Sequence, residues 1–222
     1  MMSILKRILI IFFLLFPISN IFVQNAYADF LASGDTLSTS NYEIRTFDVS
    51  GEDLLPRDVA FNNDGSKMFV VGESGKDVNE YTLSTVFNVS TAVFIDSFSV
   101  ATEDTNPMSI KFNNDGSKMF IAGRTERKVF EYSLSTNFDI SSTSVTYNGN
   151  FIDVSSQVAA GSLFGLTFSP DGTMMFVNEK GADTEHLHQY SLNKSFDLSS
   201  GANFIRSADL ETQTANEGQA RG

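Results

Sequence analysis

A nine-residue string that occurs three times constrains the fold of this chain more than any other feature. The copies are FNNDGSKMF from Phe61, FNNDGSKMF from Phe112 and FSPDGTMMF from Phe168. A second string follows each copy at a near-constant distance: EYTLSTVFNVS from residue 80, EYSLSTNFDIS from residue 131 and QYSLNKSFDLS from residue 189. Self-similarity at a fixed period indicates a repeat architecture, here with a unit of about 50 residues.

Each unit is predicted to contain four short β-strands. The first strand alternates apolar and polar residues, and the Asp-Gly pair after it is typical of a tight hairpin turn. The turn residues are Asp64 and Gly65, Asp115 and Gly116, and Asp171 and Gly172. The second strand, such as Met68 to Val71, is apolar on both faces. Because a strand buried on both faces must lie between two layers, the sequence predicts an all-β fold, a β-propeller of four-stranded blades.

Three blades are expected, over about residues 56–101, 107–154 and 163–210, after a lead-in at residues 29–41. Residues 42–50 match the last strand of a blade, and residues 211–222 match an interrupted repeat or a disordered tail. Closed propellers typically have four to eight blades. We therefore expect either a fragment of a larger propeller, which we favour, or a chain that self-associates through its open blade faces.

The repeated hairpin also resembles that of a known family. FSPDGTMMFV from Phe168 and its two FNNDGSKMF copies resemble the blade hairpin of YVTN-type and lactonase-like seven-bladed propellers, and the resemblance covers about residues 42–210. It implies blade architecture. The shared residues are turn and core residues, so the resemblance transfers no catalytic residue and no cofactor to this chain.

The first 28 residues have the features of a secretory signal peptide. Lys6 and Arg7 precede nine apolar residues, and Ala26-Tyr27-Ala28 fits the small-x-small cleavage rule. We expect cleavage between Ala28 and Asp29 and an exported protein, either secreted, periplasmic or at the cell surface. No later segment has the roughly 20 apolar residues that a transmembrane helix needs, so no membrane contact is expected after the signal is removed.

Composition excludes several classes of function. The chain has 15 Lys and Arg residues against 27 Asp and Glu, a net charge of −12, so nucleic acid is not expected as a partner. It has no Cys, which excludes disulfides, thiolate nucleophiles and Cys-based metal sites. The sequence contains neither a G-x-S-x-G elbow nor a phosphate-binding loop, and we predict no cofactor.

The only two histidines, His186 and His188, are weak candidates for a metal site. They lie two residues apart in a predicted strand and therefore on the same face, and Glu179, Asp183 or Glu185 could supply a carboxylate. Alignment of the repeats instead places His188 at a packing position and His186 at the exposed start of the strand. We favour these structural roles and expect no metal.

The connections between blades carry paired carboxylates, Glu52 with Asp53 and Glu103 with Asp104. Such pairs could act as acid and base in glycoside cleavage or bind cations. Solvated acidic loops are the favoured interpretation. The Asn-Asn-Asp-Gly loops lack the ligand spacing of a calcium loop and are interpreted as turns.

The connections between the second and third strands differ most among the units, and in propellers they share one face with the connections between blades. We take charged residues on this face as the candidate ligand-binding set: Arg57, Lys76, Asp77, Arg124, Glu126, Lys180 and Asp183. Asn88 and Asn193 begin N-x-S sequons, for which a plain turn role is favoured.

Two functions remain open at this point. The favoured one is a secreted or cell-surface propeller that acts as a binding or scaffold module for a protein, a glycan or a small solute. The alternative is an extracytoplasmic propeller enzyme of the lactonase or quinoprotein dehydrogenase class, whose site would be completed by further blades.

Overall fold

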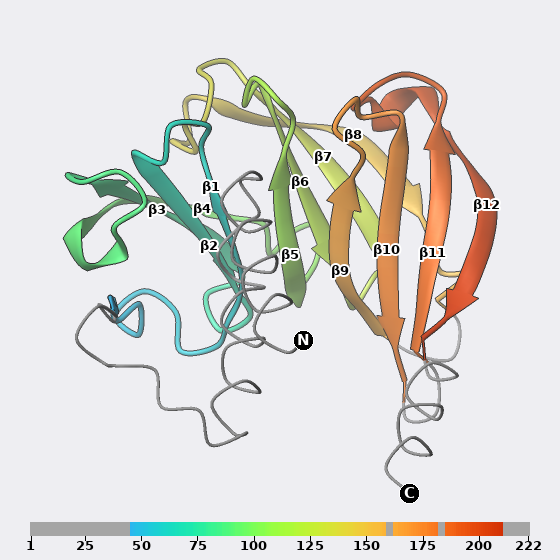
Figure 1. Ribbon diagram of the computed structural model, residues 1–222, viewed down its shortest axis with the longest axis horizontal. Helices are drawn as coiled ribbons and strands as arrows, with labels where there is room; N and C mark the ends of the chain where they lie inside the picture. The colour runs from blue at the N-terminus through green and yellow to red at the C-terminus, as the bar shows by residue number, and fades with distance from the viewer. Residues whose placement is uncertain (1–44, 159–161, 182–184, 211–222) are drawn as a thin grey trace, which may run out of the picture. The chain divides into compact units, whose positions relative to one another are not determined.

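The computed structural model describes residues 45–158, 162–181 and 185–210, which form three four-stranded antiparallel sheets (Figure 1). The strands of each sheet pair in chain order, so each sheet is one blade, and the predicted all-β propeller architecture is confirmed. The chain divides into two units, Met1–Ile44 and Arg45–Gly222, and every described residue belongs to the second. The signal peptide with its Ala28–Asp29 cleavage site, the lead-in and the tail at residues 211–222 lie outside the described residues.

The blades are called blades 1, 2 and 3. Blade 1 contains β1 (Pro56–Phe61), β2 (Lys67–Gly72), β3 (Asp77–Leu83) and β4 (Ala92–Ser99). Blade 2 contains β5 (Pro107–Phe112), β6 (Lys118–Gly123), β7 (Lys128–Leu134) and β8 (Val145–Asp153). Blade 3 contains β9 (Ser162–Phe168), β10 (Met174–Lys180), β11 (Glu185–Leu192) and β12 (Ala202–Asp209). Short 3₁₀ turns η2 (Val89–Thr91) and η3 (Leu198–Ser200) precede the last strands of blades 1 and 3.

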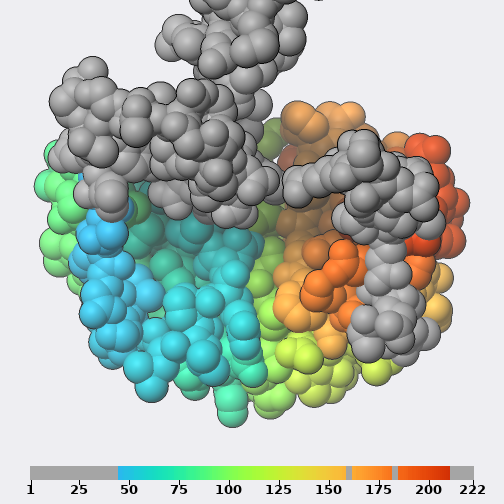
Figure 2. Space-filling model, turned by 60° about the horizontal axis from the view of Figure 1, so that its bottom comes forward, coloured from blue at the N-terminus to red at the C-terminus, as the bar shows by residue number. Residues whose placement is uncertain are grey.

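The first strands of successive blades contact each other, β1 with β5 and β5 with β9, so they form the inner edge of the array. The blades meet side by side in chain order (Figure 2). Phe69 and Val71 of blade 1 pack with Met119 and Ile121 of blade 2 in one buried cluster. A second cluster joins blades 2 and 3 in the same way. The second strands of blades 1 and 2, β2 and β6, are therefore buried on both faces, as their apolar sequences require, whereas β10 of blade 3 is fully buried on one face only.

The Asp-Gly turn after each first strand has the same conformation in all three blades. Gly65, Gly116 and Gly172 have φ values of 71°, 74° and 69°, which L-residues rarely adopt. A Cβ atom at any of them would collide with the ring of Phe87, Phe138 or Phe196, respectively. Each turn aspartate accepts a hydrogen bond from the backbone N–H two residues on, for example Asp64 Oδ1 from Ser66 at 2.9 Å. The Asp-Gly pair is thus fixed by turn geometry and ring packing.

An ion pair between a partly exposed lysine and a buried glutamate ties each of the first two blades to the next one. Lys118 Nζ lies 2.8 Å from Glu131 Oε1 and donates a hydrogen bond to the Phe196 carbonyl of blade 3 at 2.8 Å. Glu131 Oε2 accepts a hydrogen bond from the Leu198 N–H at 2.6 Å. We call this arrangement the interblade latch. Lys67 and Glu80 form the same latch from blade 1 to Phe138 and Ile140 of blade 2.

Blade 3 carries a neutral pair at the latch position. The residues that correspond to Lys118 and Glu131 are Met174 and Gln189, and the Gln189 amide lies 3.7 Å from the Met174 sulfur. The face of blade 3 that points away from blade 2 carries Met174 and Gln189, so it cannot form the charged latch that blades 1 and 2 form.

The strand predicted over residues 42–50 is wrong for residues 45–50, which have no strand conformation. No described strand pairs with this segment, and an extended segment without a ladder partner is not a β-strand. The Phe47 ring nevertheless packs edge-on against Tyr81 at 5.4 Å, just as Phe98 of β4 packs against Tyr132 at 5.9 Å. Residues 45–50 therefore cover blade 1 as the end of a preceding blade would.

Within the described residues, no helix has the length and the apolar character that crossing a membrane requires.

Candidate functional site

In blades 1 and 2, one end of the blade is built from the connection that precedes it and the turn between its second and third strands. In blade 1, Asp53 Oδ1 accepts hydrogen bonds from the Leu55 N–H at 2.6 Å and the Ser74 hydroxyl at 2.8 Å. Its Oδ2 accepts one from the Gly75 N–H at 2.6 Å. The carboxylate thus binds the connection to the turn, which explains why these two segments share one end.

Asp104 repeats this role in blade 2, where it accepts hydrogen bonds from the backbone N–H groups of Asn106 and Glu126. Asp53 and Asp104 are each only 2% exposed, so the prediction of solvated acidic loops is wrong for them. Their neighbours Glu52 and Glu103 accept hydrogen bonds from buried tyrosine hydroxyls. Every one of these carboxylates accepts hydrogen bonds from the protein. We therefore interpret the pairs as structural hydrogen-bond acceptors and not as an acid–base dyad.

Blade 3 places its carboxylate differently. Val158 occupies the connection position of Asp53 and Asp104, as shown by the same backbone hydrogen bond to the residue four positions earlier. Glu179 in β10 occupies the position of Gly72 and Gly123. A Cβ atom at either glycine would collide with the Asp53 or Asp104 carboxylate. Blades 1 and 2 thus have a carboxylate in the connection and a glycine in the second strand. Blade 3 has a valine in the connection and a carboxylate in the second strand.

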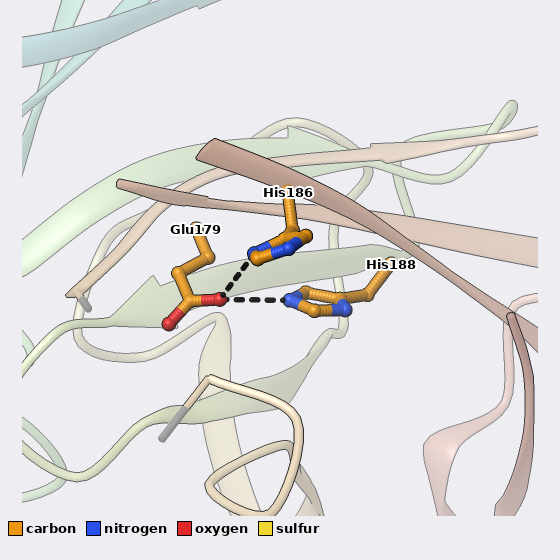
Figure 3. A group of neighbouring side chains, drawn as sticks. All are labelled: Glu179, His186 and His188. Atoms are coloured by element: carbon orange, nitrogen blue, oxygen red, sulfur yellow. Dashed lines mark hydrogen bonds and ion pairs between the residues drawn. The ribbon is translucent and has the colours of Figure 1, made fainter. Parts of the chain in front are cut away.

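Two imidazoles converge on this strand carboxylate (Figure 3). Glu179 Oε2 lies 3.2 Å from His186 Nδ1 and 3.3 Å from His188 Nε2. Glu179 pairs directly with His186 across the β10–β11 ladder, and His188 follows two residues later on the same face. The side chains of Glu179 and His188 are 2% and 3% exposed, whereas that of His186 is 31% exposed. The cluster is thus buried on one side and open to solvent on the other.

The surroundings fix the His188 ring. Its Nδ1 lies 2.7 Å from the hydroxyl oxygen of Ser207, its ladder partner in β12, and the Phe204 ring lies 6.4 Å away. Burial lowers the pKa of His188 although the Glu179 carboxylate acts in the opposite direction. The ring is therefore neutral at neutral pH and has a lone pair available on one nitrogen. Glu179 Oε1 is buried and has no hydrogen-bond partner among the described residues.

A cationic side chain lies at the same end of the blade 2–blade 3 junction. Arg124 Nε donates a hydrogen bond to the Ser162 hydroxyl at 3.0 Å, and its guanidinium carbon lies 5.5 Å from the centre of the Phe164 ring. Ser162 pairs with Lys180 in the β9–β10 ladder, and Leu163 pairs with Glu179. The inner strand of blade 3 therefore brings an arginine, an aromatic ring and a hydroxyl close to the position of the histidine cluster.

The other candidate residues are spread over the same end of the blades and are mostly paired. Arg57 forms an ion pair with Glu73, which also accepts a hydrogen bond from Asn106 at 3.1 Å. Glu126 pairs with Lys128, and Lys180 pairs with Glu185. Lys76 is exposed, while Asp77 is half-buried and accepts a hydrogen bond from Asn79. Asp183 lies outside the described residues. Arg124 and Lys180 are the members of the predicted set that the structure brings to the blade 2–blade 3 junction.

Both sequon asparagines take part in turn hydrogen bonds. Asn88 accepts hydrogen bonds from the N–H and hydroxyl of Ser90, and Asn193 donates one to the Ser200 carbonyl at 2.6 Å.

Sequence reasoning missed Ser162, Phe164 and Ser207, and it named Glu179 only as one of three carboxylates. The signal for Glu179 was present in the alignment, because a repeat that requires glycine here in two units has a carboxylate in the third.

Comparison with known proteins supports the fold. No protein-family model and no curated protein matches the sequence. A candidate 6-phosphogluconolactonase from Bacteroides uniformis has a similar structure, with 14% identity and a TM-score of 0.50 over 68% of this chain. A protein from Lactobacillus plantarum matches with 16% identity and a TM-score of 0.50 over 68% of the chain. A periplasmic gluconolactonase from Pseudomonas aeruginosa matches 70% of the chain with 16% identity and a TM-score of 0.49.

This chain spans about 40% of the length of the first two proteins and 41% of the third. The fold and these likenesses together define the class: the described residues are blades of a β-propeller, similar in structure to lactonase-like propeller proteins.

Proposed function

We propose that this protein is an exported, lactonase-like β-propeller that binds a sugar acid or its lactone at the end of blades 2 and 3. The observation that carries the proposal is the Arg124 side chain, held against the Phe164 ring and hydrogen-bonded to Ser162 at the inner edge of the junction. No carboxylate among the described residues forms an ion pair with Arg124, in contrast to Arg57, which Glu73 neutralises. A guanidinium presents paired N–H donors that fit a carboxylate or phosphate group.

The aromatic ring beside the guanidinium adds a surface of the kind that sugar rings contact. Phe164 and Ser162 lie in β9, the innermost strand of blade 3, where propellers surround their central opening. A ligand here would have an anionic group at Arg124 and its ring near Phe164. The Bacteroides uniformis protein, whose structure is similar, is described as a candidate 6-phosphogluconolactonase, which supports this class over a scaffold module. Reaction chemistry in the whole protein would include residues from further blades.

Calorimetric titration of the protein with gluconate, 6-phosphogluconate and gluconolactone tests this proposal. We expect binding of at least one of the three, weakened about tenfold or more in Arg124→Ala, because a charge-assisted bidentate contact contributes about 1.5–3 kcal/mol. Arg57→Ala is the matched control, since its guanidinium lies at the same end of blade 1 and is already paired. Equal affinities of the two variants, or no binding of any of the three compounds, would contradict the proposal.

Export is the second part of the proposal and rests on the N-terminal sequence. A mature N-terminus at Asp29, determined by mass spectrometry of the protein recovered outside the cytoplasm, would support it. An intact N-terminus on protein from the cytoplasm would contradict it.

A further inference from the structure

We propose that Glu179, His186 and His188 bind one divalent transition-metal ion, of the zinc type, at the edge of blade 3. The proposal goes beyond ligand binding at Arg124 and rests on different side chains. Three independent features of the described residues support it: the spacing of the donor atoms, the incomplete bonding of the buried carboxylate, and the support of one imidazole from behind.

The spacing of the donor atoms fits a tetrahedral ion. Zinc binds imidazole nitrogen and carboxylate oxygen at about 2.0–2.2 Å, which places neighbouring ligand atoms of a tetrahedron about 3.3 Å apart. The Glu179 Oε2 atom lies 3.2 Å from His186 Nδ1 and 3.3 Å from His188 Nε2. One donor atom from each of the three side chains lies within 4.8 Å of the other two. An ion could therefore bind with only small side-chain movements.

The other two blades provide an internal comparison for the buried carboxylate. Asp53 and Asp104 are buried at the equivalent place, and backbone N–H groups bond to both oxygens of each. Glu179 is equally buried, yet its Oε1 has no hydrogen-bond partner among the described residues. A buried carboxylate without its full set of partners is costly, and a cation bound to that carboxylate would offset part of the cost by neutralising its charge. The other two blades have Gly72 and Gly123 at this position, so Glu179 is not required by the repeat itself.

The third feature is the position of Ser207. It approaches His188 from β12 at Nδ1, opposite the nitrogen that faces Glu179. Metal-binding histidines usually donate their second N–H to an oxygen, which fixes the ring orientation. The β11–β12 ladder pairs His188 directly with Ser207, so the sheet itself supplies this support.

The donor set defines the class of ion. Two imidazole nitrogens and one carboxylate suit zinc, cobalt and nickel, whereas calcium and magnesium require mainly oxygen ligands. Three protein ligands leave a fourth position for water or for a ligand group, and the partly exposed His186 marks the side from which solvent reaches it. The site is therefore of the open kind.

The experiment is calorimetric titration of chelator-treated protein with Zn²⁺, with the bound metal counted by elemental analysis. We expect one Zn²⁺ per chain, not displaced by excess Mg²⁺ or Ca²⁺. His188→Asn and His186→Lys introduce the residues that blades 1 and 2 carry at these positions, Asn79 and Lys128, so each variant keeps a side chain that the repeat already accommodates. Each should weaken Zn²⁺ binding about 100-fold or more, and Ser207→Ala about 10- to 100-fold.

Glu185→Gln is the matched control, because it removes a neighbouring carboxylate of β11 that is paired with Lys180 and lies outside the cluster. Its affinity should stay within about threefold of the parent. Thermal melts without metal would establish that each variant folds, and His186→Lys decides the matter if His188→Asn does not, since His186 is partly exposed. No stoichiometric Zn²⁺ binding by the parent would overturn the proposal. So would unchanged affinity in the folded histidine variants, which would leave the cluster as a hydrogen-bonded pair of imidazoles on a carboxylate.

Discussion

The interblade latch gives the sharpest test of how the blades hold together. Replacing Lys118 and Glu131 of blade 2 with Met and Gln reproduces the neutral pair that blade 3 carries at Met174 and Gln189. The double variant Lys118→Met/Glu131→Gln should therefore fold, and its stability should differ from the sum of its two single changes.

The magnitudes follow from three contacts. Glu131 is 3% exposed and accepts hydrogen bonds from Lys118 at 2.8 Å and from the Leu198 N–H at 2.6 Å, while Lys118 also donates to the Phe196 carbonyl at 2.8 Å. Lys118→Met leaves a buried carboxylate without its cation and should cost about 3 kcal/mol. Glu131→Gln keeps an acceptor for Leu198 but removes the carboxylate from the ammonium group, which keeps only its hydrogen bond to the Phe196 carbonyl, at a cost of about 2 kcal/mol. The double variant has neither orphaned charge and should cost only about 1–2 kcal/mol.

Urea unfolding of the parent and the three variants, followed by circular dichroism, measures these differences as shifts of the midpoint at constant slope. The expected coupling between the two residues is about 3–4 kcal/mol, well above the error of a double-mutant cycle. If the double variant costs as much as the two single changes together, Lys118 and Glu131 act independently, and the latch described above does not exist as a unit.

Three further predictions concern the Asp-Gly turn, the end of blade 2 and the N-terminal cap of η3. Gly116→Ala should destabilise the protein by about 1–3 kcal/mol in urea unfolding, because φ is 74° there and the new Cβ would collide with Phe138; a neutral result would refute the turn assignment. Gly123→Ala should cost about 1–3 kcal/mol by collision with Asp104, and Asp104→Val should relieve part of that cost, since blade 3 has a valine there; melting temperatures would show whether the two changes compensate. Hydrogen bonds from Ser199 lower the pKa of Asp197 to about 2 from 3.8, so the carboxylate stabilises the fold above about pH 4, and that contribution is lost as the pH falls towards 2. Asp197→Asn should accordingly be less stable than the parent at pH 7 and nearly equal to it at pH 2, and an unchanged difference across acid titration would count against this assignment.

Much of the fold was predictable because the same local sequence features occur in all three repeats. The Asp-Gly turns, the doubly apolar second strands and the spacing of the strings each report a local requirement that three copies display together. The strand predicted over residues 42–50 is wrong for residues 45–50. A β-strand requires a hydrogen-bonded neighbour, and the pattern of one segment does not reveal whether such a neighbour lies beside it.

The candidate sites were only partly predictable for a related reason. Arg124, His186 and His188 could be named from their types and positions, but their partners Ser162, Phe164 and Ser207 belong to other strands and are common residue types. The acidic pairs look solvated in the sequence because charge predicts exposure on average. Burial of Asp53 depends on the backbone N–H groups of a turn about 20 residues away, which only the folded chain brings to it.

The sequence by itself determined the blade: its length, its strands, its turn chemistry and its alternation of buried faces, because these depend on interactions between residues close along the chain or repeated at a fixed period. Tertiary structure alone decided which charged residues form the interblade latch and which carboxylate lies at the end of each blade. It also decided that Glu179 contacts two imidazoles through one oxygen, while its other oxygen has no partner among the described residues. The physical reason is that hydrogen bonding and burial of a polar group are set by atoms from distant strands, which strand register brings within about 3 Å of one another.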